Sequence, residues 1–269
     1  MRMASLGSGS RGNATLLQAA ETCILVDCGF SLRDIQRRAA LRGIDLGDLD
    51  AILVTHEHSD HASGVATLAR HYGIPVYLTH GTLASGRVAN CPDVRAFNAD
   101  TQLHIGAFTV QAVTVPHDAR EPVQYCFEYG GQRAGVLTDL GSVTSHVRSA
   151  FNDCNLLLLE FNHDRRLLAD GPYPPALKRR VGGDWGHLSN SQATELLGQL
   201  NLQRLEHLAI AHISEKNNSR DCVEAQLRDL DPVLLEKAVW ACQGAGFDWI
   251  EAARDTTASK SQREPVQAP

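Results

Sequence analysis

The stretch AILVTHEHSDH, residues 51–61, decides the fold of this chain. Its first four residues are apolar and predict a buried strand that runs directly into three histidines and an aspartate. Imidazole and carboxylate groups are natural ligands of zinc and other first-row divalent ions. Side chains two apart in an extended segment point the same way, so His56 and His58 can hold one ion, while Asp60 and His61 lie past the turn and can face a second. A solvated loop of ordinary histidines is the weaker interpretation, because four ligand-type residues follow one strand so closely.

The composition is that of a globular protein. The 269 residues are 43% hydrophobic and 21% charged, and the net charge of −6 argues against a protein that coats nucleic acid over its whole surface. Seven cysteines without a Cys-x-x-Cys pair favour reduced thiols, and the chain has no apolar segment long enough for export or for a membrane span. We therefore expect a cytoplasmic protein without membrane contact. Residues 1–253 are predicted to form one domain, and the polar residues 254–269 a disordered tail.

Short apolar runs that end in polar or turn residues recur along the chain and predict buried strands. The clearest are at 23–26, 51–54, 136–137, 156–159 and 208–211. Segments 108–115 and 125–129 predict antiparallel strands, with a glycine turn at 130–131. Helical patterns lie at 32–42, 64–72, 189–200 and 219–229. Together these elements predict two mixed β-sheets with helices outside.

The pattern His-x-His-x-Asp-His at residues 56–61 resembles the signature of the metallo-β-lactamase superfamily. Further candidates follow strands in the expected order, at His117, Asp139 and His212. The resemblance implies an αββα sandwich of the α/β class with two divalent ions at one edge. The implied ligands of one ion are His56, His58 and His117. Those of the other ion are Asp60, His61 and His212, with Asp139 bridging.

The same resemblance implies a hydrolytic reaction. A pair of ions can hold a bridging hydroxide and clamp both oxygens of a displacement, with Asp60 orienting that hydroxide or accepting its proton. Zinc is the first choice, and manganese or iron stays open because no cysteine is among the ligands.

Two later segments bear on the substrate. Glu160 follows a strand, and the loop Gly-His-Leu-Ser-Asn stands at 186–190. This arrangement resembles the phosphodiesterase branch of the superfamily, which implies His187 as a phosphate ligand or general acid and Glu160 as its orienting partner. A simple helix-entry loop is the alternative interpretation of Gly186-His187.

Local charge supports a phosphodiester substrate. Between His163 and Arg180 there are five Lys or Arg residues against two aspartates, although a solvated charged face would look the same. The sequence GSGSRGN at 7–13 offers backbone N–H groups for an anion, or it forms a hairpin turn. The predicted phosphate contacts are Ser8, Arg11, Asn13, His163, Lys178 and Arg179.

From residue 1 to 212, and more loosely to 249, the chain is similar to the YycJ/WalJ-like metallohydrolases. The matching pieces are SGSRGN at 8–13, VDCG at 26–29, the main metal motif, EFNHD at 160–164, KRR at 178–180, GHLSN at 186–190 and AHIS at 211–214. This branch is associated with 5′ to 3′ DNA exonuclease activity and DNA repair, so the resemblance implies DNA as substrate. A thioesterase or lactonase, a small-molecule phosphodiesterase and a non-catalytic metal-binding module remain as alternatives.

Overall fold

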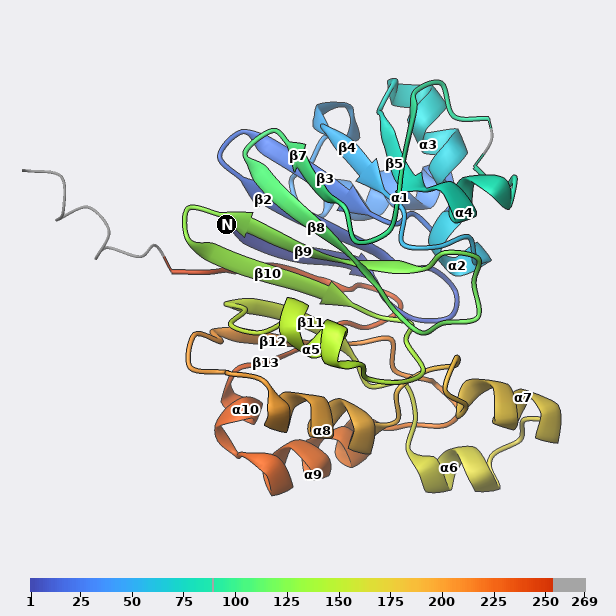
Figure 1. The fold of residues 1–269 in the computed structure, drawn as a ribbon, viewed down its shortest axis with the longest axis vertical. Helices are drawn as coiled ribbons and strands as arrows, with labels where there is room; N and C mark the ends of the chain where they lie inside the picture. The colour runs from blue at the N-terminus through green and yellow to red at the C-terminus, as the bar shows by residue number, and fades with distance from the viewer. Residues whose placement is uncertain (89, 254–269) are drawn as a thin grey trace, which may run out of the picture.

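Two seven-stranded β-sheets pack face to face, and helices cover their outer faces (Figure 1). The computed structural model describes residues 1–88 and 90–253, so the predicted disordered tail at 254–269 lies outside the described residues. The four layers confirm the predicted αββα sandwich. Within the described ranges, no helix has the length and apolar character needed to cross a membrane.

The first sheet contains the amino-terminal strands and one strand from the end of the chain. Its order is β14-β1-β2-β3-β4-β5-β6, antiparallel from β14 to β3 and parallel from β3 to β6. The strands are β1 (Arg2–Gly7), β2 (Ala14–Ala19), β3 (Thr22–Val26), β4 (Ala51–Leu53), β5 (Val76–Thr79), β6 (Val94–Phe97) and β14 (Phe247–Glu251).

The second sheet repeats this mixed plan. Its order is β13-β12-β11-β10-β9-β8-β7, parallel from β13 to β10 and antiparallel from β10 to β7. The strands are β7 (Gln102–Ile105), β8 (Phe108–Thr114), β9 (Val123–Tyr129), β10 (Gln132–Leu137), β11 (Leu156–Glu160), β12 (His207–Ala211) and β13 (Ala238–Trp240).

Helices fill the connections between strands. On the side of the first sheet they are α1 (Leu32–Ala40), the 3-10 turn η1 (Leu46–Asp48), α2 (Ser59–Ala62), α3 (Val65–Tyr72) and α4 (His80–Ala84). On the side of the second sheet they are α5 (Ser145–Ala150), α6 (Arg165–Asp170), α7 (Pro175–Val181), α8 (Asn190–Gln199), α9 (Arg220–Leu230) and α10 (Val233–Glu236). The four predicted helices are confirmed as α1, α3, α8 and α9.

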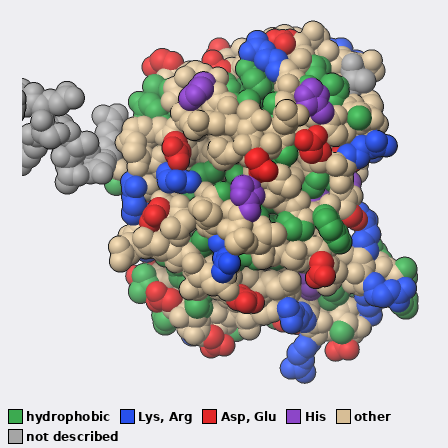
Figure 2. Space-filling model, in the orientation of Figure 1, with side chains coloured by type: hydrophobic (Ala, Val, Ile, Leu, Met, Phe, Trp, Pro, Cys, Tyr) green, Lys and Arg blue, Asp and Glu red, His purple; other side chains and the backbone are tan. Residues whose placement is uncertain are grey.

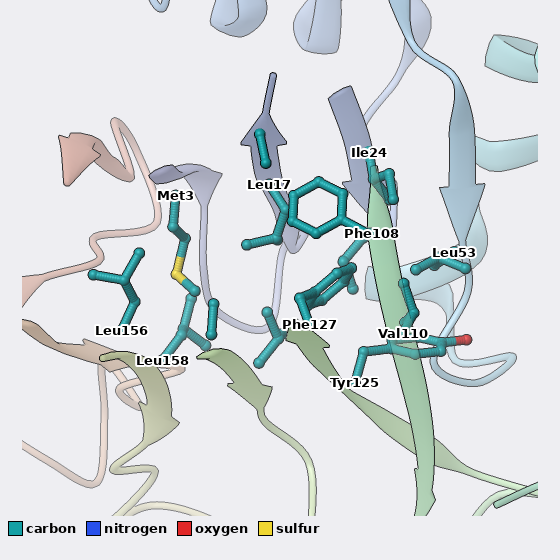
Figure 3. Close-up of a cluster of buried hydrophobic side chains, with 14 of the residues drawn as sticks. Met3, Leu17, Ile24, Leu53, Phe108, Val110, Tyr125, Phe127, Leu156 and Leu158 are labelled. Carbon is teal, nitrogen blue, oxygen red and sulfur yellow. The ribbon is translucent and has the colours of Figure 1, made fainter. Parts of the chain in front are cut away.

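Alternation along the strands explains the layers, since successive side chains of a strand point to opposite faces. In β11, Leu156 and Leu158 join the cluster between the sheets, while Leu157 and Leu159 join the cluster beneath the outer helices. Figure 3 shows the inner cluster, in which Leu156 and Leu158 lie near Met3 at the left of the view, and the aromatic rings of β8 and β9 lie farther to the right. A run of four leucines is therefore buried on both faces, as the sequence predicted.

Helices α6 and α7 stand apart from this layering. The only buried residue of α6 is Leu168, and none of the described residues of α7 is buried. In Figure 1 the pair projects from one end of the molecule, away from the stack of α8, α9 and α10. These two helices are not among those predicted from the sequence, because α7 has no buried apolar stripe and α6 is only six residues long.

Candidate metal centre and active site

The histidine-rich motif occupies the loop after β4 and the short helix α2. His56 and His61 are fully buried, and the carbonyls of Asp60 and His61 accept hydrogen bonds from Asn13 N (2.7 Å) and Cys28 N (2.8 Å). A Cβ atom at Gly29 would lie only 1.8 Å from the Asp60 carbonyl oxygen, so only glycine allows the chain after β3 to approach α2 this closely. The motif is thus held by main-chain contacts on both sides.

Three imidazoles converge as predicted for the first ion. His56, His58 and His117 form one group whose nitrogen atoms lie within 4.8 Å of one another. In each ring, the nitrogen directed away from the centre of the group, called the far nitrogen, faces an oxygen. His56 Nδ1 faces Thr55 Oγ1 (2.9 Å). His58 Nε2 faces the Asp118 carbonyl (3.2 Å), and His117 Nδ1 faces the Gly186 carbonyl (2.9 Å). These contacts assign the proton to the far nitrogen, so the lone pairs of the other three nitrogens face the centre of the group.

The donor set fits a divalent ion. His56 Nε2 is buried and has no hydrogen-bond partner among the described residues, while His58 Nδ1 and His117 Nε2 lie 3.2 Å apart. Burial and the neighbouring His61 lower the pKa of His56 well below its usual range, and burial also lowers the pKa of His117. Both rings are therefore neutral, which is the form that binds a metal.

Asp139 is at the centre of the second group. Its Oδ2 lies 3.0 Å from His61 Nε2 and 3.1 Å from His212 Nδ1, and its Oδ1 lies 3.4 Å from His187 Nδ1. The structure places it in two ligand groups, one with His56 and His61 and one with Glu160, His187 and His212. Asp139 thus belongs to both groups, and its role as a bridge between two ions, which the resemblance implies, stays a prediction.

Asp60 lies slightly farther out. Its Oδ2 is 3.6 Å from His61 Nε2 and 4.0 Å from His212 Nε2, and it lines the cavity above the cluster. The groups formed by the described residues thus differ from the predicted ligand set: Asp60 belongs to none of them, and His61 is grouped with His56 rather than with His212. Glu160 and His187, which the sequence analysis treated as catalytic residues, lie within ligand distance of Asp139 and His212.

Glu160 holds His187 in place. Glu160 Oε1 accepts hydrogen bonds from Leu140 N (2.9 Å) and Leu188 N (3.0 Å), and its Oε2 lies 3.1 Å from His187 Nδ1. Burial lowers the pKa of His187, but the carboxylates of Glu160, Asp139 and Asp60 together outweigh burial and raise it to about 9. Because Nδ1 is occupied, Nε2 is the ring nitrogen that remains for the cavity, which His187 lines.

Asp27 is a site residue that the sequence analysis quoted but did not assign. Its Oδ2 lies 2.7 Å from His61 Nδ1, and its carboxylate also accepts hydrogen bonds from Thr55 N and Thr55 Oγ1, each at 2.8 Å. The pKa of His61 is lowered by burial but raised more strongly by Asp139 and Asp27, so it lies well above the usual range. The position of Asp27 directly after β3, like that of Asp139 after a strand, is the signal that could have identified it.

Three of these residues stand at strand ends in the left-handed backbone region. The φ angles are 61° at Asp27, 53° at Asp139 and 50° at His212. Aspartate and histidine both visit this region more readily than most residues other than glycine. The turn directs each side chain inward immediately after its strand ends, which brings residues from β3, β10 and β12 to one place.

A cavity of about 410 Å³ opens above the cluster. One wall contains the site residues and the other contains apolar side chains from α7 and the segment before it. Three basic residues, Arg87, Arg180 and Lys216, also line the cavity, and Arg180 donates a hydrogen bond to Asp118 beside His117. The cavity lining also includes Asp60, Asp139, Tyr173, Leu177, His187 and His212.

The predicted phosphate contacts fall in other surroundings. Ser8 Oγ accepts from His212 N (2.9 Å), and Asn13 Nδ2 lies 3.0 Å from His61 Nε2, so both contact ligand residues directly. Arg11 forms a two-point ion pair with Glu215 (2.9 and 2.7 Å) on the surface. None of these three residues is in the described cavity lining, although Ser10 from the same loop is.

The other three predicted contacts lie near α7. Lys178 Nζ donates to the Ala169 carbonyl (2.5 Å), and Arg179 is exposed. His163 is buried, its Nδ1 has no hydrogen-bond partner among the described residues, and burial lowers its pKa to about 4. Phosphate contact by these residues stays a prediction, whereas Arg180, not among those predicted, reaches the cavity.

Fold and site together define a metallohydrolase of the αββα class. A sequence profile described as "Beta-lactamase superfamily domain" matches residues 22–213. Exodeoxyribonuclease YycJ of Bacillus anthracis is 33% identical over 220 residues, covering 80% of this chain and 83% of the relative. Exodeoxyribonuclease WalJ of Streptococcus pneumoniae is 34% identical over 223 residues, covering 80% and 82%.

A solved structure agrees with the fold. The metallo-β-lactamase fold protein YhfI from Bacillus subtilis superimposes with a TM-score of 0.69 at 18% identity, covering 93% of this chain and 99% of that one. The chain belongs to the beta-lactamase superfamily and, within it, to the group that contains YycJ and WalJ.

Proposed function

We propose that this protein is a dinuclear metal-dependent phosphodiesterase that removes nucleotides from DNA in the 5′ to 3′ direction. The observation that carries the proposal is the paired cluster of His56, His58 and His117 beside Asp139, His187 and His212, which adjoins a cavity with basic residues. The relatives named exodeoxyribonuclease support a DNA substrate. With seven free thiols, the protein would act in the cytoplasm.

The ions, zinc first and manganese or iron as alternatives, would be held by His56, His58 and His117 and by Asp60, His61 and His212, with Asp139 shared, which leaves His187 and Glu160 free for proton transfer. When bound, such a pair supplies a nucleophile at neutral pH and stabilises the charge on the attacked phosphate. The remaining steps belong to the side chains of the chain itself.

Three sets of residues would bind the substrate, accept a proton and donate a proton. Arg180 and Lys216 line the cavity as cations and would orient the phosphodiester by charge-assisted hydrogen bonds. Asp60 lies 3.6 Å from His61 at the cavity wall and would accept the proton of the attacking water. His187, held at Nδ1 by Glu160, would donate a proton from Nε2 to the leaving oxygen.

The test is hydrolysis of bis(4-nitrophenyl) phosphate and of 5′-labelled single-stranded and double-stranded DNA, with added Zn²⁺ or Mn²⁺. The Asp60→Ala variant is the control for contaminating nucleases. Metal-dependent release of labelled mononucleotide as the first product, absent in the variant, supports the proposal and its polarity. A ladder of shortened labelled products overturns the polarity.

Other outcomes redirect the assignment. Cleavage of the aryl diester without cleavage of DNA assigns the site to small phosphodiesters. Inactivity toward both substrates, in a protein that binds two metal ions, rejects phosphodiester chemistry and makes thioesters and lactones the next substrates to assay.

A further inference from the structure

Trp185 is the exposed aromatic residue of the loop that joins α7 to His187. It is 63% exposed, and its indole makes no hydrogen bond or ring contact in the described part of the chain. Tryptophan is enriched in binding interfaces relative to the rest of the protein surface, so an exposed indole on a loop that contacts the site is a candidate for ligand contact. The proposal below rests on the proposed function and specifies the form of its substrate.

The loop that carries Trp185 is fixed to the site on three sides. The Trp185 carbonyl accepts from Asp118 N (3.0 Å), the Gly186 carbonyl faces His117 Nδ1 (2.9 Å), and His187 N donates to the Val181 carbonyl (2.9 Å). The Trp185 backbone is therefore positioned by the same contacts that position a predicted metal ligand and the predicted general acid.

Glycine at 141 allows this close packing. A Cβ atom there would lie 2.3 Å from the Asp184 carbonyl carbon and 2.4 Å from Gly186 N, so the loop rests directly on the turn that follows Asp139. Ser142 Oγ also donates to the Asp184 carbonyl (3.2 Å). A rigid backbone with an exposed indole is a preorganised platform, because little conformational entropy is lost when a ligand stacks on it.

The surroundings of Trp185 carry positive charge. Residues 164–186 hold five Lys or Arg residues and three aspartates, in a chain whose net charge is −6. Figure 2 shows basic side chains gathered at the end of the molecule where Figure 1 places α6 and α7. Arg180, the last of these five basic residues, lines the cavity and donates a hydrogen bond to Asp118. The basic residues of α6 and α7, Trp185 and the site residue His187 thus follow one another along the sequence.

We propose that Trp185 is a stacking platform for an unpaired nucleobase of the substrate, so that the site takes its strand in single-stranded form. Aromatic side chains bind single strands by stacking on base faces, and adjacent cations bind the backbone phosphates. A duplex conceals those faces within its own stack, so it offers Trp185 no equivalent contact until its end opens. The cavity and Trp185 then hold neighbouring parts of one strand.

The experiment compares Trp185→Ala and Trp185→Phe with the wild type, using a short oligothymidylate and bis(4-nitrophenyl) phosphate. We expect the ratio of kcat/KM for the oligonucleotide to that for the aryl diester to fall about tenfold in Trp185→Ala, and to be largely restored in Trp185→Phe. Leu41→Ala, which removes an exposed apolar side chain from the end of α1, is the matched control and leaves the ratio unchanged. An unchanged ratio in Trp185→Ala overturns the inference.

A binding assay separates this inference from the proposed function. Fluorescence anisotropy of labelled oligothymidylate is measured in the Asp60→Ala background with and without Trp185→Ala. About tenfold weaker binding in the double variant supports the platform even if the wild type hydrolyses no diester at all. Equal binding by both proteins, or an equal loss on a blunt duplex, overturns it.

Discussion

The two halves of the candidate metal centre hold their imidazoles in different ways. In the half formed by His56, His58 and His117, the far nitrogens face a hydroxyl and two carbonyl oxygens. In the half around Asp139, the far nitrogens of His61 and His187 face the carboxylates of Asp27 and Glu160. The hydrogen-bond partners of the first half are therefore neutral, with the Asp118 carboxylate farther away at 3.7 Å from His58 Nε2, whereas carboxylates are the direct partners in the second half.

This difference changes what each half does to a bound ion. Neutral oxygens fix the orientation of a ring without adding charge, whereas a carboxylate behind an imidazole also increases its basicity. The pKa directions follow the same division: burial lowers the pKa of His56 and of His117, while carboxylates outweigh burial and raise the pKa of His61 and of His187. The second half is thus the one that concentrates negative charge beside the phosphate site.

The largest expected effect comes from removing the charge that the two halves share. Asp139→Asn should cost the protein about one bound ion and lower diester hydrolysis on the order of a thousandfold, because Asp139 belongs to both ligand groups. Metal content by mass spectrometry and initial rates check this. Asp34→Asn, on the exposed face of α1, is the matched control and should keep both ions. Full metal content with normal activity in Asp139→Asn would remove this residue from the centre.

Glu160→Gln tests the charged half without deleting a side chain. The amide oxygen can still accept from Leu140 N and Leu188 N, but the amide nitrogen then faces His187 Nδ1 and reverses that hydrogen bond. We expect kcat to fall about a hundredfold with little change in KM, because an effect of this size is typical when a proton-transfer group is lost. Glu195→Gln on α8 is the control. A raised KM with normal kcat would instead assign Glu160 to substrate binding.

Asp27→Asn replaces the carboxylate that faces His61 Nδ1 with a neutral amide. Loss of a carboxylate partner behind a metal-binding histidine typically costs ten- to a hundredfold in metal affinity. Competition with a chromophoric chelator measures that affinity directly. Unchanged affinity would show that the 2.7 Å contact between Asp27 and His61 Nδ1 orients the ring without tuning it.

Thr55→Val makes the corresponding change near the neutral half and should have the smallest effect. Thr55 Oγ1 faces His56 Nδ1 and donates to Asp27. Valine has a similar shape, so the substitution removes the hydroxyl that orients His56 without removing a charge. We expect metal affinity to fall about tenfold, at the low end for such partners, and less than in Asp27→Asn. The same chelator competition checks the order. If Thr55→Val is the more damaging change, the contrast between the two halves is wrong.

The sequence predicted the features of this molecule that are encoded locally. Apolar runs identify β3, β4, β10, β11 and β12, and the spacing of His56, His58 and His61 identifies the ligand loop. The ligands after later strands could be predicted because parallel strands end at one edge of a sheet, so residues that follow such strands meet.

Contacts between distant segments could not be predicted in the same way. Arg11 and Glu215 are 204 positions apart, and nothing local to either residue indicates that they pair. Arg180 reaches the cavity because α7 projects beside it, whereas its neighbours Lys178 and Arg179 do not line it. A run of three basic residues therefore predicted the surface but could not distinguish the member that enters the site.

The left-handed turns at Asp27, Asp139 and His212 bear on laboratory evolution. Glycine is the residue that this backbone geometry favours, and each non-glycine residue there costs about 1 kcal/mol of stability. A choice of stabilising substitutions from backbone geometry alone would therefore place glycine at these three positions and delete the buried side chains that form the centre. Libraries built for thermostability should keep codons 27, 139 and 212 fixed.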